Sequence, residues 1–225
     1  GLAAHRAAVG LVFLLQQALH HHLGGDAGMI GTRHPEYIVS LHPFPAAEDI
    51  LQGVVEGMPH VQGAFRQELV IDARQAFRLA EGVSDAEGAM AEPLSVALHA
   101  VNRAGPMLGR KVLVTGCGPI GAMAIIAARR AGATHIVATD VVAQPLSKAL
   151  AVGSDRVINV ADEPEALAEY AAEKGQFDVL LEASGNERAL RAAFDVLRPR
   201  AVVVQLGLSG SELTLPFNTL VAKEF

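Results

Sequence analysis

Six consecutive residues in the middle of the chain have the types and the spacing needed to bind a phosphate. Gly116-Cys117-Gly118-Pro119-Ile120-Gly121 is a GxGxxG motif that follows an apolar, strand-like run and opens a helix-like one. The first glycine permits a tight turn, the second leaves room for a pyrophosphate, and the third lets the helix pack closely. N–H groups at the helix start would face the phosphates. The motif therefore predicts a dinucleotide site formed by Gly116, Gly118, Pro119, Ile120 and Gly121.

An acidic residue at the end of the next predicted strand supports this interpretation. Asp140 follows Gly116 by 24 residues, close to the roughly 20-residue spacing of an acid that binds the adenosine ribose. Its carboxylate can accept from both ribose hydroxyls and repels a 2′-phosphate. Val141 and Val142 come next, where an arginine would favour NADP. NAD is therefore the predicted cofactor. The structural alternative makes Asp140 a turn residue or a helix cap.

Strands alternate with helices from residue 110 onward. Strands are expected at 111–115, 135–139, 156–160, 177–182 and 201–206, and helices at 122–131, 145–151, 163–174 and 187–197. Such alternation indicates βαβ units and a parallel sheet. The predicted fold is therefore α/β, a Rossmann-type doubly wound sheet. Ser184 and Gly207 follow the fourth and fifth strands, where a nicotinamide would lie, and they favour a dinucleotide over the S-adenosylmethionine of a methyltransferase.

Composition and charge argue against several classes of partner. The formal charge is −6 with no basic stripe, so neither nucleic acid nor an anionic membrane is an expected partner. The single cysteine, Cys117, permits no intrachain disulfide and no thiolate-rich zinc site, and we expect it to be a packed residue in a cytoplasmic protein. The apolar run at 7–19 is shorter than the roughly 20 residues of a membrane span. It favours a core helix over an export signal.

The first hundred residues carry less chemistry. A helix at 3–21 and a strand at 37–41 are expected before residue 58, and strands at 64–71 and 75–79 after it. Ser84 and Glu87 have capping-box spacing, which predicts a helix start. A second helix is expected at 94–103. The three histidines at 20–22 point about 100° apart on a helix, so a solvated helix end is favoured over a metal site.

Several segments resemble the medium-chain dehydrogenase/reductase superfamily. The segments at 110–121 and 91–100 carry this likeness, and those at 59–65, 174–179 and 215–224 resemble the sorbitol dehydrogenase and L-idonate 5-dehydrogenase group. The resemblance implies an NAD-dependent oxidation of a secondary alcohol on a polyol or sugar acid, with L-idonate as the first candidate. It also implies a zinc ion that lowers the pKa of the substrate alcohol, and a dimer or tetramer.

The resemblance gives Glu92, in the sequence Glu92-Pro93-Leu94, a role at the zinc, either directly or through a water molecule. Without the resemblance, Glu92 is a carboxylate stabilised by the dipole at a helix start. No catalytic residue is assigned.

The chain departs from the family pattern in its first part. An early cysteine ligand, a Gly-His-Glu segment and a four-cysteine loop of the family are missing from the sequence, and residues 1–58 do not show the resemblance. We expect 1–58 to be an unassigned segment, 59–105 a remnant of a GroES-like catalytic domain with linking helices, and 106–225 a Rossmann domain that stops before a sixth strand. A fragment, a disrupted gene product and a remodelled relative all fit. Zinc binding is therefore in doubt, and the alternative function is an inactive dinucleotide-binding fragment.

Overall fold

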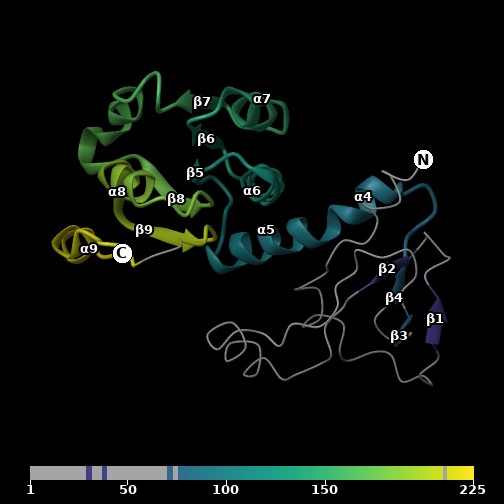
Figure 1. Ribbon diagram of the computed structural model, residues 1–225. Coiled ribbons are helices and arrows are strands. Elements are labelled where there is room, and N and C mark those ends of the chain that lie inside the picture. The colour runs from purple at the N-terminus through teal and green to yellow at the C-terminus, as the bar shows by residue number, and fades with distance from the viewer. Residues whose placement is uncertain (1–28, 32–36, 40–69, 73–75, 210–211) are drawn as a thin grey trace. The chain divides into compact units, whose positions relative to one another are not determined.

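The computed structural model describes residues 29–31, 37–39, 70–72, 76–209 and 212–225 (Figure 1). The chain divides into two compact units, residues 1–95 and 96–225, and the boundary falls inside one helix, α5 (Ala91–Arg103). The helix expected at 3–21 and residues 64–69 of a predicted strand lie outside the described residues. Within the described part of the chain, no helix is long and apolar enough to cross a membrane.

The first unit contains two short antiparallel pairs and a capped helix. Strand β1 (Met29–Gly31) pairs with β3 (Val70–Asp72), and β2 (Tyr37–Val39) pairs with β4 (Ala76–Arg78). Helix α4 (Asp85–Ala89) begins with the predicted capping box. The Glu87 backbone N–H donates to the Ser84 hydroxyl at 3.3 Å, and the Ser84 N–H donates to the Glu87 carboxylate at 2.8 Å. The local sequence signal is confirmed.

The second unit is built on a parallel sheet of five strands. Their order is β7-β6-β5-β8-β9, so the chain leaves the centre at β5 in one direction and returns to build the other half. The strands are β5 (Lys111–Thr115), β6 (His135–Asp140), β7 (Arg156–Asn159), β8 (Phe177–Glu182) and β9 (Leu197–Gln205). All neighbouring strands in this sheet are parallel. The predicted Rossmann-type sheet is confirmed, and its topological switch point lies between β5 and β8.

Helices cover both faces of this sheet (Figure 1). Val112 and Val114 of β5 face the cluster formed with α6 (Pro119–Arg130) and α7 (Ala143–Ala151). Leu113, between them, faces the cluster formed with η2 (Ala166–Lys174) and α8 (Glu187–Val196). Successive strand residues point to opposite faces, which explains the continuous apolar run of a strand buried on both sides. The small Ala124 and Ala128 of α6 are fully buried.

Several element boundaries differ from the sequence prediction, and three of them have a clear local description. Helix α6 begins at Pro119, earlier than the predicted residue 122, because the fixed φ of proline suits the first position of a helix. The segment predicted as a helix at 163–174 is a 3-10 helix over Ala166–Lys174, which breaks where Glu173 takes a left-handed φ of 58°. Strand β9 begins at Leu197 rather than at residue 201. Helix α9 (Phe217–Lys223) was not predicted.

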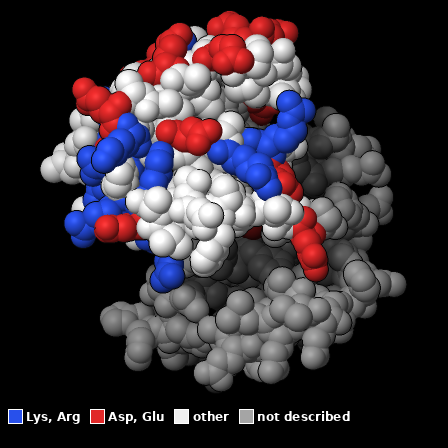
Figure 2. All heavy atoms as spheres, turned by 90° about the vertical axis from the view of Figure 1, so that its left-hand side faces the viewer, with Lys and Arg blue, Asp and Glu red and all other residues white. Residues whose placement is uncertain are grey.

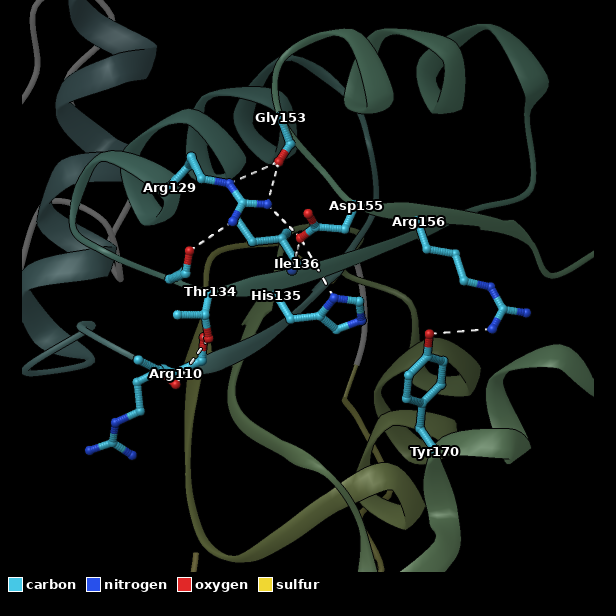
Figure 3. A network of polar contacts seen from close by, with 11 residues as sticks. Arg110, Arg129, Thr134, His135, Ile136, Gly153, Asp155, Arg156 and Tyr170 are labelled. Atoms are coloured by element: carbon cyan, nitrogen blue, oxygen red, sulfur yellow. Dashed lines mark hydrogen bonds and ion pairs between the residues drawn. The ribbon is translucent and has the colours of Figure 1, made fainter.

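Polar contacts fasten the amino edge of the sheet (Figure 3). The Asp155 carboxylate accepts from the Ile136 N–H at 2.7 Å and from the Arg129 guanidinium. Arg129 also donates to the Gly153 carbonyl at 2.8 Å and 3.1 Å. These contacts join the end of α6 to the starts of β6 and β7. They lie at the edge opposite the glycine-rich loop.

A second carboxylate holds the same edge at β8. Asp178 is buried, accepts from the Lys111 N–H at 2.6 Å, and forms ion pairs with Arg198 and Arg110. On the face that carries α8 and α9, Figure 2 shows Lys and Arg in separate clusters with Asp and Glu between and above them. Charge on this face is therefore mixed rather than gathered into one basic stripe.

Candidate functional site

The glycine-rich loop leaves β5 at a point where backbone segments are in close contact. Gly116 has a φ of +84°, and its N–H donates to the Thr139 carbonyl at the end of β6 at 2.8 Å. A Cβ at this position would lie 2.7 Å from the Ser184 nitrogen, beyond the end of β8. The predicted tight turn is confirmed. Gly116 also meets a second need, because any side chain would push the loops of β5 and β8 apart.

Gly118 and Pro119 place an uncapped helix start at this edge. Gly118 is the N-cap residue of α6, with extended backbone and no side-chain cap, and Pro119 is the first residue of the helix. A Cβ on Gly118 would meet nothing within 4 Å. The first N–H groups of a helix have no acceptor within it and carry the positive end of the dipole. The open space at Gly118 therefore suits an anionic group such as a pyrophosphate.

Gly121 has a second role besides the one that its spacing predicts. We predicted that it lets the helix pack on the strand, and Val114 of β5 would indeed be 3.7 Å from an added Cβ. The tighter contact, however, is with the loop itself, since that Cβ would lie only 1.9 Å from the Gly116 carbonyl oxygen. The glycine thus allows the first turn of α6 to fold back onto its own loop.

The Asp140 carboxylate fastens the loop to the end of β6. One oxygen, Oδ2, accepts from the Cys117 N–H at 2.7 Å, and the other, Oδ1, accepts from the Val141 and Val142 N–H groups at 2.7 and 3.0 Å. The turn role that we left open is therefore present in the structure. A carboxylate has about four acceptor positions, so Asp140 retains capacity for a ribose hydroxyl, and that second role stays a prediction.

Cys117 is packed inside the loop. Its side chain is buried, with the sulfur 3.5 Å from the Thr139 carbonyl oxygen. Burial, and then the charge of Asp140, raise the pKa of the Cys117 thiol to about 12. The thiolate is the reactive form of cysteine, so Cys117 is suited to packing rather than to nucleophilic chemistry.

The two remaining predicted cofactor residues lie on loops that touch each other. A Cβ on Gly207, which follows β9, would come within 2.1 Å of the Gly185 nitrogen, next to Ser184 in the loop after β8. The structure thus brings Gly116, Ser184 and Gly207 together at the carboxyl edge, as the spacing suggested. Contact of these residues with a cofactor remains a prediction.

Glu182, which ends β8 and is fully buried, is a further residue of this edge that was not predicted from the sequence. Its carboxylate accepts from the Ser184 N–H at 2.8 Å and from the Gly185 N–H at 3.0 and 3.1 Å. It also accepts from Thr115 at 3.2 Å and from Gln205. A charged residue directly after the apolar run 179–181 was the available signal, because such a group requires polar partners once it is buried.

Glu92, the predicted metal residue, is the second residue of α5. It is half-buried, and desolvation raises the pKa of its carboxyl. Among the described residues, no three His, Cys, Asp or Glu side chains gather in a way that could hold a metal ion. We therefore derive no step through zinc, and the metal role of Glu92 stays a prediction.

Comparison with known proteins relates this geometry to a family. Residues 119–225 match the family model described as zinc-binding dehydrogenase. L-idonate 5-dehydrogenase (NAD(P)(+)) of Escherichia coli strain K12 is 36% identical over 191 residues, 85% of this chain and 55% of the relative. Sorbitol dehydrogenase of Ovis aries is 40% identical over 146 residues, 64% of this chain and 41% of the relative.

A solved structure shows the same arrangement. The crystal structure of L-idonate 5-dehydrogenase from Escherichia coli K-12 superposes with a TM-score of 0.69 at 36% identity, covering 74% of this chain and 47% of that one. The chain thus spans about half the length of the relatives that it matches. The similarity over 191 residues also exceeds the span from residue 59 to residue 225, so it reaches into the segment that the sequence left unassigned.

Proposed function

The chain belongs to the zinc-binding dehydrogenases through its residues 119–225, and we propose that it binds NAD at the carboxyl edge of the five-stranded sheet. We propose that the parent dehydrogenase of this chain oxidises a secondary alcohol of a polyol or sugar acid. L-idonate is the first candidate substrate because of the 36% identical relative. The observation that carries the proposal is the open space at Gly118, beside the uncapped start of α6. The cytoplasm is the proposed compartment, since a single buried cysteine suits a reducing environment.

Each part of the site has a task toward the cofactor. The first N–H groups of α6 bind the pyrophosphate, and Gly118 leaves room for it. Asp140 accepts from the adenosine ribose while it holds the loop through the Cys117 N–H. The loops at Ser184 and Gly207 border the nicotinamide end. When bound, NAD supplies the acceptor for the hydride that leaves the alcohol carbon.

A second candidate function is dinucleotide binding without dehydrogenase chemistry. The observation that favours it is that the described residues assemble no group of metal ligands around Glu92. In this case the chain retains a cofactor site, while oxidation of an alcohol would need ligands that the sequence analysis did not recognise.

Self-association is also proposed, through the outer edge of β9. This strand ends the sheet order, and its residues Val202, Val203 and Val204 are half-buried and uncharged. An apolar edge strand with unpaired backbone groups invites pairing with another chain. We expect a second copy of this chain as the partner. A monomer in analytical ultracentrifugation at micromolar concentration would contradict this part of the proposal.

The phosphate role of the loop predicts the effect of Gly118→Val. The added methyl groups enter the space reserved for the pyrophosphate, so we expect NADH binding to be lost in calorimetric titration. The free energy of unfolding, measured in urea, should change by no more than about 0.5 kcal/mol, because the space is open and the backbone of Gly118 is extended. Gly118→Ala is the graded control and should weaken binding less. Normal NADH binding by the valine variant would show that the cofactor is elsewhere.

The charge of Asp140 predicts a preference for NADH over NADPH, although the Escherichia coli relative is named for both forms of the cofactor. We expect Asp140→Ala to weaken NADH binding by roughly 1–3 kcal/mol, as unpaired hydrogen-bonding groups are left behind. Asp140→Asn is the matched variant, since it keeps the size of the side chain but removes the repulsion of a 2′-phosphate. It should reduce the ratio of NADH affinity to NADPH affinity. Equal affinities of the native chain for both cofactors would remove the ribose role.

Metal analysis separates the two candidate functions. Tight catalytic zinc needs about three protein ligands, and Glu92 is the one residue assigned to it. We therefore expect residues 1–225 to bind less than one equivalent of zinc and to leave L-idonate and sorbitol unoxidised with NAD. Stoichiometric zinc, with turnover that Glu92→Ala destroys, would instead establish a complete dehydrogenase. The histidines at 20–22, 34 and 42 would then be the first ligands to test.

A further inference from the structure

The Glu182 carboxylate is fully buried at the point where three strands end. It lies at the carboxyl end of β8, between β5 and β9 in the sheet. Among the described residues, its hydrogen-bond partners include no Lys, Arg or His. Burying a carboxylate is costly unless hydrogen bonds replace its hydration. The donors around Glu182 must therefore be held where they can hydrogen-bond to its two carboxylate oxygens.

These donors come from all three strand ends. The Thr115 hydroxyl is the last side chain of β5, at 3.2 Å from Oε1. The N–H groups of Ser184 and Gly185, with the Ser184 hydroxyl, belong to the loop after β8. The Gln205 amide ends β9 and also donates to the Gly207 carbonyl at 2.8 Å. One carboxylate thus sets the relative positions of three loops that follow neighbouring strands.

The backbone around Glu182 leaves little room for adjustment. A Cβ on Gly207 would lie 2.8 Å from Glu182 Oε2, and a Cβ on Gly185 would lie 2.3 Å from the Leu208 carbonyl oxygen. The Leu206 and Gly207 N–H groups donate to the Glu182 carbonyl at 2.7 and 2.8 Å. A shift of the carboxylate would therefore move the loop after β8 directly, and it would reach the loop after β9 through the Gln205 amide, which donates both to the carboxylate and to the Gly207 carbonyl.

The other end of β8 provides an internal comparison. Asp178 is also buried, but it pairs with Arg198 and Arg110 at the amino edge. Its contacts stabilise the sheet, since they join the starts of β5, β8 and β9. Glu182 instead binds backbone N–H groups of the loops that border the proposed nicotinamide end. The two carboxylates on one strand thus face different tasks.

We propose that Glu182 is a positioning residue for the nicotinamide end of the cofactor. It holds the Ser184–Gly185 and Gly207–Leu208 loops in the arrangement that receives the nicotinamide ring, without contacting the cofactor itself. This inference rests on the proposed function. It differs from a purely structural role in one respect, because it concerns the nicotinamide half of the dinucleotide and leaves the adenosine and pyrophosphate half unaffected.

Titrations with NADH and with ADP-ribose test the proposal. ADP-ribose contains the adenosine and pyrophosphate groups but lacks the nicotinamide, so the ratio of the two affinities reports on the nicotinamide end alone. The 225-residue chain is compared with Glu182→Gln, which keeps the side-chain size but replaces one acceptor oxygen by an NH2 group that faces donors. Gln205→Ala is a milder variant, because it removes one donor from an exposed side chain. Asp178→Asn is the matched control.

We expect the native chain to bind NADH more tightly than ADP-ribose. In Glu182→Gln the NADH affinity should fall by about fivefold or more, the effect of one misplaced hydrogen bond, with ADP-ribose affinity nearly unchanged. Gln205→Ala should move the ratio in the same direction by less. Asp178→Asn should lower the urea midpoint and keep the native ratio.

Three results would overturn the inference. If both Glu182→Gln and Gln205→Ala kept the native ratio of NADH affinity to ADP-ribose affinity, the loops would not depend on the carboxylate. Equal losses of NADH and ADP-ribose affinity in Gln205→Ala, which should fold, would indicate a general structural role. If the native chain bound ADP-ribose and NADH equally, the loops would make no nicotinamide site. Failure of the native chain to bind either ligand would instead refute the proposed function, on which this inference rests.

Discussion

Close approach of backbone to backbone at the carboxyl edge governs the candidate site. The turn at Gly116 lies against the loop after β8, and that loop lies against the one after β9, with distances that leave no space for a Cβ. Glycine at these contacts is a steric requirement, and at Gly116 the positive φ of the turn requires it as well. Because the loops touch, the uncapped start of α6, the Asp140 carboxylate and the Ser184–Gly185 turn come to occupy one edge of the sheet.

The two edges of the sheet use charge in opposite ways. At the amino edge, Asp155 and Asp178 bind arginines, so charge is neutralised across element starts. At the carboxyl edge, Asp140 and Glu182 accept from backbone N–H groups and neutral side chains. An anion entering this edge meets the start of α6 and an open space at Gly118. Ion pairs thus stabilise one edge, while hydrogen bonds to backbone N–H groups hold the loops of the other.

Cofactor binding and alcohol chemistry are separable in a chain of this kind. The features suited to a dinucleotide lie within residues 111–208, inside the unit that carries the sheet. The carboxylate that resemblance assigns to zinc, Glu92, lies in the other unit. A protein can therefore bind a dinucleotide without oxidising an alcohol. Because the relatives are about twice as long as this chain, the two properties must be tested independently.

Local sequence patterns determined the order of the elements and most of the glycine-rich loop. Apolar runs such as 112–114 and 179–181 predicted the strand positions, because a strand buried on both faces has no polar alternation. Capping at Ser84 and the turn at Gly116 also depend on near neighbours. Only the tertiary structure decided what Glu182 does, since its partners at residues 115 and 205 are far apart in the chain. It likewise showed that Asp140 supports the loop and that Gly121 packs on Gly116, because hydrogen bonds and steric contacts between separate segments form only once the strands align.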